Sequence, residues 1–176
     1  HSRSVIKRLF DLVALVASES HPGQKVSEAD FHAEQSLDDA AVVIWTTTPW
    51  TIPGNRAISF SNRMEYSLVK VTEAPEGNWL GVGEKLIIAT KLIETVMKAA
   101  KVTGWRDLRV VDAKELAAIV CRHPLADMGY SYPIPMLDGD HVTDDAGTGF
   151  VHTEPSHGAD DYNIWIANQK ALRNRG

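Results

Sequence analysis

Short runs of apolar and β-branched residues recur along this chain, and clusters of Pro, Gly and polar residues separate them. Such runs predict strands, because β-branched side chains fit the pleated surface of a half-buried sheet. The predicted strands are residues 41–47, 66–72, 86–89, 108–111, 117–121 and 149–153. Helices are predicted over residues 91–101, capped by Thr90, and over residues 160–172, with acids in the first turn. The pattern favours a mixed α/β fold, mainly β, in which a closed, barrel-like sheet carries a few peripheral helices.

The N-terminal part of the chain has a different character. Residues 5–18 carry apolar side chains at helical spacing, and residues 19–39 are polar with Pro22 and Gly23, as in a linker. We therefore expect residues 1–39 to form a poorly ordered helix and linker, and residues 40–176 to form the domain. Pro and Gly cluster within residues 124–139, which predicts irregular structure there. The chain begins with His1 and not Met, as expected of a piece cut from a longer protein.

Composition limits the function classes. The 176 residues carry a formal net charge of −5. General attraction to nucleic acid rests on many Lys and Arg, so any RNA contact should be local or come from another part of a larger protein. The single cysteine, Cys121, can form neither an internal disulfide nor a multi-cysteine zinc site, which favours the reducing cytoplasm. The apolar run at residues 9–17 is too short to span a bilayer, so no membrane contact is expected.

The first unusual segment is residues 45–57, WTTTPWTIPGNRA. Thr46, Thr47 and Thr48 stand at a strand end and precede Pro49 and Pro53. Proline fixes the turn and lacks a donor, so the threonine hydroxyls and the N–H groups of Thr47 and Thr48 become available to a ligand. Threonine is also an ordinary strand residue, so the pattern alone leaves a purely structural role open.

The second segment is residues 144–162, DDAGTGFVHTEPSHGADDY. Gly147 and Gly149 permit a close approach of the backbone, and His152 lies on the predicted strand. Asp160 and Asp161 stand where a carboxylate could hold an ammonium group. An ordinary hairpin turn would also explain the glycines, and favourable contact with the helix dipole would explain either acid.

Other kinds of site find less support in the sequence. Several residues in the second half of the chain could bind a metal, but no His-Glu-x-x-His motif or cysteine pair is present. A nucleophilic hydrolase stays open because Cys121 and Ser156 are present, yet no G-x-S-x-G motif supports one. The candidate metal ligands are His141, His152, Glu154, His157, Asp160 and Asp161.

Residues 46–58 and 145–162 together resemble the two signature segments of the isoleucyl-tRNA synthetase editing domain, and the resemblance extends over residues 41–165. The related valyl and leucyl enzymes have Thr-Thr-Arg-Pro where this chain has Thr-Thr-Thr-Pro-Trp. They also lack the pair His152–Thr153. Both differences indicate the isoleucine enzyme.

The resemblance implies hydrolysis of valine mischarged on tRNA(Ile), with valyl-adenylate as an additional candidate substrate. It implies that Asp161 binds the substrate ammonium and that His152 borders the amino-acid side chain and sets a size limit. Thr46, Thr47 and Thr48 would contact the terminal ribose and position water. The wider substrate-binding set would be Trp50, Asn55, Gly149, Phe150, Val151, Thr153 and Asp160, in which Trp50 and Asn55 support the threonine loop.

The chain departs from the bacterial pattern at four positions. That pattern usually has Ala and Gly in place of Glu154 and Ser156, commonly has Ala in place of Gly54, and commonly has a smaller residue in place of Phe150. These departures affect the fine shape of the pocket.

The chain contains no segment like His-Ile-Gly-His or Lys-Met-Ser-Lys-Ser, the marks of an aminoacylation core. This piece alone should therefore not activate amino acids, and it needs no cofactor, whereas the full-length enzyme uses ATP and Mg. Its expected partners are the 3′ end of tRNA(Ile) and the rest of the synthetase chain. Two rival hypotheses are a module that recognises an aminoacyl or adenylate group without catalysis, and a metal-dependent hydrolase.

Overall fold

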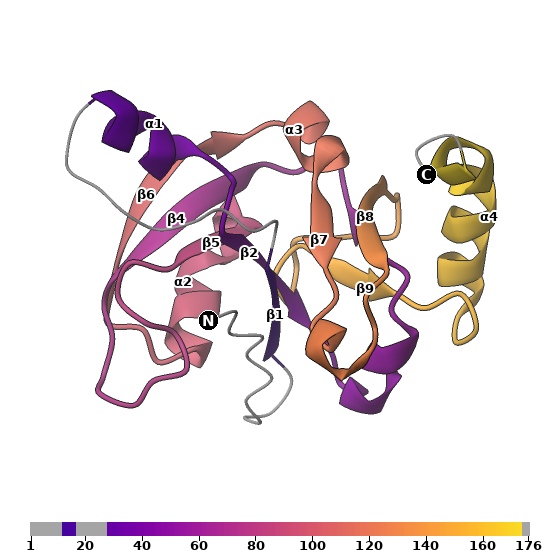
Figure 1. Ribbon diagram of the computed structural model, residues 1–176, viewed down its shortest axis with the longest axis horizontal. Helices are drawn as coiled ribbons and strands as arrows, with labels where there is room; N and C mark the ends of the chain where they lie inside the picture. Colours follow the sequence, from indigo (N-terminus) through magenta and orange to yellow (C-terminus); the bar gives the residue numbers. More distant parts are fainter. Residues whose placement is uncertain (1–11, 17–27, 174–176) are drawn as a thin grey trace.

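A computed structural model describes residues 12–16 and 28–173, and its strands form two separate sheets (Figure 1). The five-stranded sheet has the order β1 (Leu12–Val16), β2 (Ala40–Trp45), β5 (Lys85–Ala89), β4 (Tyr66–Glu73) and β6 (Gly104–Val111). The four-stranded sheet has the order β7 (Val120–Arg122), β8 (Pro133–Asp138), β3 (Ala57–Phe60) and β9 (Val151–Thr153).

Both sheets are mixed, because β2 pairs with β5 and β3 pairs with β8 in parallel, while the other neighbours are antiparallel. The prediction of a closed barrel was wrong. Within the described residues, β1 and β6 end the larger sheet as edges, and β3 pairs with β8 and β9 and not with a strand of the larger sheet. The mixed, mainly β class was predicted correctly.

The helices lie around the sheets. They are α1 (Glu28–Gln35), η1 (Pro49–Gly54), η2 (Thr90–Leu92), α2 (Ile93–Ala99), α3 (Ala113–Ala118), η3 (Ala126–Met128) and α4 (Ala159–Arg173). Helix α4 lies beside the smaller sheet, where Ile164 packs against Ala57 and Leu137 (Figure 1). No helix among the described residues is long and apolar enough to cross a membrane.

Several local predictions need correction. Residues 12–16 form a strand paired with β2 and not the predicted helix; the rest of 5–18 lies outside the described residues. Residues 28–35, predicted as linker, form α1. Thr90 does not cap α2, because a 3-10 turn precedes that helix. The strand predicted at residues 117–121 begins only at Val120, and β8 lies inside the segment predicted as irregular.

Helix α3 replaces the start of that predicted strand because its N-terminus is well capped. The Asp112 carboxylate accepts hydrogen bonds of 2.8 Å from the N–H groups of Lys114 and Glu115. The Glu115 carboxylate accepts in return from Asp112 N at 3.2 Å, which completes a capping box. Arg109 binds both oxygens of Glu115 at 2.8 Å and lowers the pKa of that carboxyl group.

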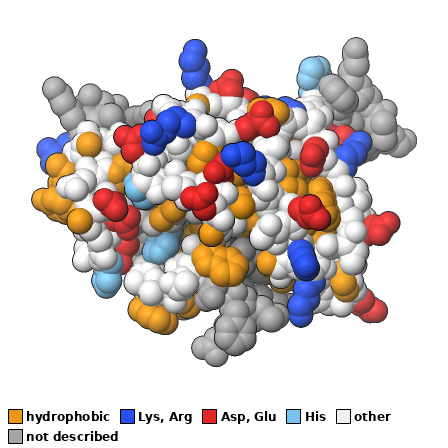
Figure 2. Space-filling view, turned by 180° about the vertical axis from the view of Figure 1, so that it is seen from behind, with side chains coloured by type: hydrophobic (Ala, Val, Ile, Leu, Met, Phe, Trp, Pro, Cys, Tyr) orange, Lys and Arg blue, Asp and Glu red, His pale blue; other side chains and the backbone are white. Residues whose placement is uncertain are grey.

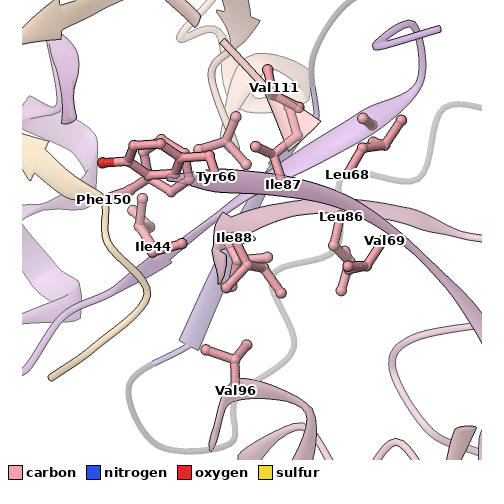
Figure 3. Packing of buried hydrophobic residues seen from close by; sticks show 14 of the residues in the cluster. Ile44, Tyr66, Leu68, Val69, Leu86, Ile87, Ile88, Val96, Val111 and Phe150 are labelled. Carbon is pink, nitrogen blue, oxygen red and sulfur yellow. The ribbon is translucent and has the colours of Figure 1, made fainter. Parts of the chain in front are cut away.

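A continuous apolar core joins the larger sheet to the segment that follows residue 144 (Figure 3). Leu68, Ile87 and Ile44 have no exposed surface. Phe150 reaches the same core, where its ring centroid lies 4.7 Å from that of Tyr66. The second signature segment is therefore packed directly on the larger sheet.

Candidate functional site

The threonine segment leaves the end of β2 and turns into η1. Pro49 stands at the start of η1, and Thr51 Oγ1 donates to Thr48 O at 2.8 Å. Thr48 N donates to Thr46 Oγ1 at 3.1 Å, so this N–H group is used within the loop and is not free for a ligand as predicted. Thr47 is exposed and Thr46 is buried. These local hydrogen bonds therefore hold the hydroxyl groups of Thr46, Thr48 and Thr51 close together in the turn.

His152 faces those hydroxyls from the other signature segment. The pairing of β9 with β3 places it opposite Ile58. Its Nε2 atom lies 3.4 Å from Thr46 Oγ1 and 3.4 Å from Thr51 Oγ1, while its buried Nδ1 has no hydrogen-bond partner among the described residues. Burial lowers the pKa of His152, although Asp161 and Glu154 oppose this shift. The ring is therefore neutral at physiological pH.

Asp161 lies in the first turn of α4, where the helix dipole favours a carboxylate. Its Oδ2 atom accepts a hydrogen bond of 2.8 Å from Glu154 N, at the end of β9. The side chain is partly exposed, whereas Asp160 is exposed one residue earlier. The turn between β9 and α4 thus fixes one oxygen of a single carboxylate next to the strand that carries His152.

The position of Gly149 has neither the space nor the backbone conformation for a side chain. Its φ is 83°, and a Cβ atom there would lie 2.3 Å from Ala89 Cβ. Its carbonyl accepts a 2.8 Å hydrogen bond from Tyr66 OH, which accepts in turn from Ser61 N at 3.0 Å. Burial raises the pKa of Tyr66 to about 12, so it stays a donor. These contacts fix the start of the second segment to the larger sheet.

Two buried polar contacts join β9 to the rest of the site. Asn55 Oδ1 accepts from Thr153 N at 3.2 Å, and Thr153 Oγ1 lies 2.7 Å from Ser59 Oγ. Of the wider set predicted to bind substrate, Asn55, Phe150 and Thr153 are buried, Val151 is half-buried, and Trp50 is 73% exposed. Gly149 is also buried, so among this set only Trp50 and Asp160 are exposed.

The sequence patterns did not indicate three residues that the structure places at this site, namely Thr51, His123 and Tyr132. Thr51 completes the hydroxyl group around His152, and His123 Nε2 lies 3.0 Å from Ile52 O in η1. Tyr132 OH donates to Pro53 O at 2.8 Å. Thr51 could have been found, because it belongs to the same run of hydroxyl residues. The contacts of His123 and Tyr132 depend on distant pairing that no local pattern reveals.

A cavity of about 430 Å³ lies beside this cluster. Gly54, Arg56, Tyr132, Glu154 and Trp165 line it, and the Arg56 guanidinium lies 4.2 Å from the centroid of the Tyr132 ring. The threonines, His152 and Asp161 are not among the residues that line this cavity. The cavity therefore adjoins Gly54 and Glu154 and not the hydroxyl groups around His152.

The geometry bears on the alternative chemistries. Cys121 is buried, and burial raises its thiol pKa to about 12, which makes it a poor nucleophile. Within residues 12–16 and 28–173, no three His, Cys, Asp or Glu side chains lie close enough together to hold a metal ion. On the face shown in Figure 2, acidic and basic side chains are interspersed and form no broad basic surface.

Comparison with known proteins identifies the family. The chain is 54% identical over 145 residues to isoleucine–tRNA ligase of Rhodopseudomonas palustris and 56% identical over 144 residues to that of Agrobacterium fabrum. These matches cover 81% and 82% of this chain. The chain belongs to the isoleucyl-tRNA synthetase editing-domain family. It spans only 14% and 15% of those two relatives' lengths. No model in a collection of protein families matches.

Solved structures agree on the fold of this editing-domain family. GlLeuRS-CP1, from a leucyl-tRNA synthetase, superposes with a TM-score of 0.65 at 16% identity, covering 94% of this chain and 66% of its own. The editing domain of Plasmodium falciparum cytosolic leucyl-tRNA synthetase gives a TM-score of 0.62 at 11% identity, covering 94% and 67%. At such identities the likeness concerns the fold.

Proposed function

We propose that this chain hydrolyses valine from mischarged tRNA(Ile), as the editing domain of an isoleucyl-tRNA synthetase. The observation that carries the proposal is the cluster of Thr46, Thr51 and His152 with the anchored carboxylate of Asp161 close in the fold. Its setting in a chain more than half identical to isoleucine–tRNA ligases supports the same function.

The need for such a site follows from the limits of recognition. A pocket that accepts isoleucine cannot strongly reject valine, since one missing methylene changes binding by only about 1–3 kcal/mol, a limit for which this very enzyme is the usual example. A second pocket that excludes the larger side chain can supply the remaining discrimination. We assign the size limit to His152, whose ring is half-buried, neutral and held between two threonines.

Asp161 suits the role of ammonium anchor. Glu154 N occupies one of its carboxylate oxygens, and the partly exposed side chain leaves acceptor capacity for a charge-assisted hydrogen bond. Every aminoacyl group carries this ammonium, so the contact anchors the substrate without selecting valine. Thr46 and Thr48 would contact the terminal ribose, and the exposed Thr47 and Trp50 would meet the nucleotide.

The proposed reaction needs no covalent intermediate. Water adds to the ester carbonyl carbon, the bond from that carbon to the ribose oxygen breaks, and the ribose oxygen leaves with a proton from water. Asp161 would be occupied by the ammonium, so we assign most of the rate to positioning, backbone donors and a neighbouring ribose hydroxyl of the substrate. Valyl-adenylate would fit the same anchor and size limit.

The chain spans about one seventh of its relatives' length, so most of the parent enzyme lies outside it. We propose that it is an inserted domain of that enzyme, that other domains hold most of the tRNA, and that ATP and Mg act elsewhere. A net charge of −5 agrees with a module that borrows its RNA affinity.

The test is deacylation of Val-tRNA(Ile) and Ile-tRNA(Ile) by this chain at high enzyme concentration. Valine should be released faster than isoleucine, and Asp161→Ala should lose at least about 90% of the rate because a charge-assisted contact is removed. Asp107→Ala is the control, since this acid is exposed on the edge strand β6 and belongs to neither signature segment, so it should retain the wild-type rate. Unchanged hydrolysis by Asp161→Ala would reject the anchor. Absence of hydrolysis with retained binding would favour a recognition module.

A further inference from the structure

Gly54 lacks a side chain for reasons of space. It ends η1, and its φ lies outside the left-handed region, so its backbone conformation does not require glycine. A Cβ atom there would lie 2.4 Å from Glu154 Oε1, 2.6 Å from Cδ and 2.7 Å from Cγ. Because all three atoms are too close, turning the carboxylate alone would not relieve the contact. The space above Gly54 is therefore filled by the Glu154 side chain.

Glu154 is an unusual residue to bury. It is 8% exposed, and a carboxylate taken out of water needs partners. Its Oε2 lies 2.5 Å from His157 Nδ1, and its carbonyl accepts from His157 N at 3.0 Å. Its own N–H donates to Asp161 Oδ2 at 2.8 Å. One residue thus links η1, the turn after β9 and the candidate ammonium anchor.

We propose that Glu154 is a positioning residue for Asp161. Its side chain, seated above Gly54 and next to His157 Nδ1, fixes the place of its own amide group, and that amide orients the Asp161 carboxylate. The inference rests on the proposed function, in which Asp161 holds the substrate ammonium. It assigns a role to the pair Gly54 and Glu154, which lie outside the set of residues that the proposed function gives to substrate contact.

The pair should behave as a matched unit. Gly54→Ala would expel the buried side chain, and Glu154→Ala would leave a gap and an unpaired His157. Substitutions of residues in direct contact have non-additive effects. The double variant Gly54→Ala/Glu154→Ala should therefore hold the Asp161 carboxylate in a more native position than Gly54→Ala alone, because the new methyl group enters the space that Glu154 vacates. Glu154→Gln keeps the shape of the side chain above Gly54, so it should preserve the geometry of the amide group and of Asp161.

The experiment measures binding of two hydrolysis-resistant ligands by calorimetry. One is an amide-linked valyl-adenosine, and the other is the same compound without its α-amino group. The ratio of their Kd values isolates the ammonium contact, which a general loss of structure would not change selectively. Gly54→Ala and Glu154→Ala should each reduce this ratio by about tenfold, the size of a charge-assisted hydrogen bond. The double variant and Glu154→Gln should stay within about threefold of wild type.

Equal weakening of both ligands, or an unchanged ratio in both single variants, would overturn the positioning role. A double variant no better than Gly54→Ala would also overturn it. If Gly54→Ala does not fold, the comparison of Glu154→Ala with Glu154→Gln still decides. Asp161→Asn separates the proposed function from the role of Glu154. If Asp161→Asn leaves the ratio of Kd values unchanged, the proposed anchor fails and the inference fails with it. If Asp161→Asn lowers the ratio but the Gly54 and Glu154 variants do not, only the role of Glu154 is rejected.

Discussion

Both sheets bury apolar side chains, but they differ in the polar side chains that they bury. In the described strands of the larger sheet, Ser67 is the one buried polar residue, and its hydroxyl pairs with Thr90 Oγ1 at 2.8 Å. The smaller sheet and its loops bury Ser59, Thr153 and Asn55, which bond to one another across β3, β9 and η1. The larger sheet is thus held mainly by apolar packing, whereas the smaller one adds directed polar contacts to its own buried apolar residues.

This difference suggests a division of labour. Apolar packing is non-directional and stabilises the fold as a whole, whereas buried hydrogen bonds fix groups at particular distances. The candidate site lies beside these buried hydrogen bonds, with His152 on β9 and Asp161 in the first turn of α4. We therefore expect stability and activity to respond differently to changes in the two sheets.

The largest effect on stability should come from Leu68→Ala in β4. Leu68 has no exposed surface, so truncation should lower the free energy of unfolding by about 2–5 kcal/mol. Urea unfolding measures the loss, and deacylation of Val-tRNA(Ile) below the transition should keep its kcat. Leu68→Met is the matched control and should cost less than about 1.5 kcal/mol. A fall in kcat of the folded Leu68→Ala protein would contradict the division.

Ser59→Ala should lower stability less than Leu68→Ala does, but it should lower the deacylation rate more. The change leaves Thr153 Oγ1 buried without its 2.7 Å partner, which should cost about 1–3 kcal/mol. The double variant Ser59→Ala/Thr153→Val removes both polar groups and should be more stable than the single one. Parallel unfolding and deacylation assays test this. Activity equal to wild type in Ser59→Ala would show that β9 does not need this contact.

Local sequence patterns predicted β2, β4 and β5 of the larger sheet, but they missed β1 and wrongly suggested a closed barrel. Residues 66–72 and 86–89 alternate or cluster in the manner of strands and form β4 and β5. Residues 12–16 belong to a continuous apolar run, in which helical spacing and strand character cannot be told apart. Barrel closure depends on which edges meet, and this is decided by pairing between distant segments.

The candidate site shows the same limit. Thr46 and His152 are 106 residues apart, and only the family resemblance placed their two segments in one site; their contact was not predicted. Gly54 and Glu154 stood out separately as departures, but their contact became visible only in three dimensions. The hydrogen bond from Thr48 N to Thr46 Oγ1 could not be predicted either, because it depends on the rotamer of Thr46.

A weaker effect should come from pH, through the buried histidine that supports η1. His123 accepts from Leu125 N at Nδ1 and faces Ile52 O with Nε2, which only the neutral ring with a proton on Nε2 satisfies. Burial lowers the pKa of His123. In the unfolded chain this histidine has its ordinary pKa of about 6.5, so as the pH falls the unfolded chain takes up a proton before the folded chain does. Stability should therefore be full above about pH 7.5 and decline as the pH falls.

Urea unfolding at pH 7.5 and 5.5 measures this decline. His123→Gln should show a smaller difference between the two pH values than wild type, because one titrating group is gone. The effect should be smaller than the loss in Ser59→Ala. His152 shares the direction of the shift, so part of the decline should remain in the variant. An equal decline in both proteins would remove His123 from the account.

The smallest effect should come from a polar pair at the surface of the same region. Arg63 Nη2 lies 2.8 Å from Asp140 Oδ1, but the two side chains are 63% and 97% exposed. Water and salt screen such a pair, so Asp140→Asn should change the free energy of unfolding by no more than about 1 kcal/mol, and by less in high salt. Unfolding at two salt concentrations measures it. A loss as large as that of Ser59→Ala would mean that polar contacts hold the smaller sheet wherever they occur, and that burial does not decide which of them fix the site.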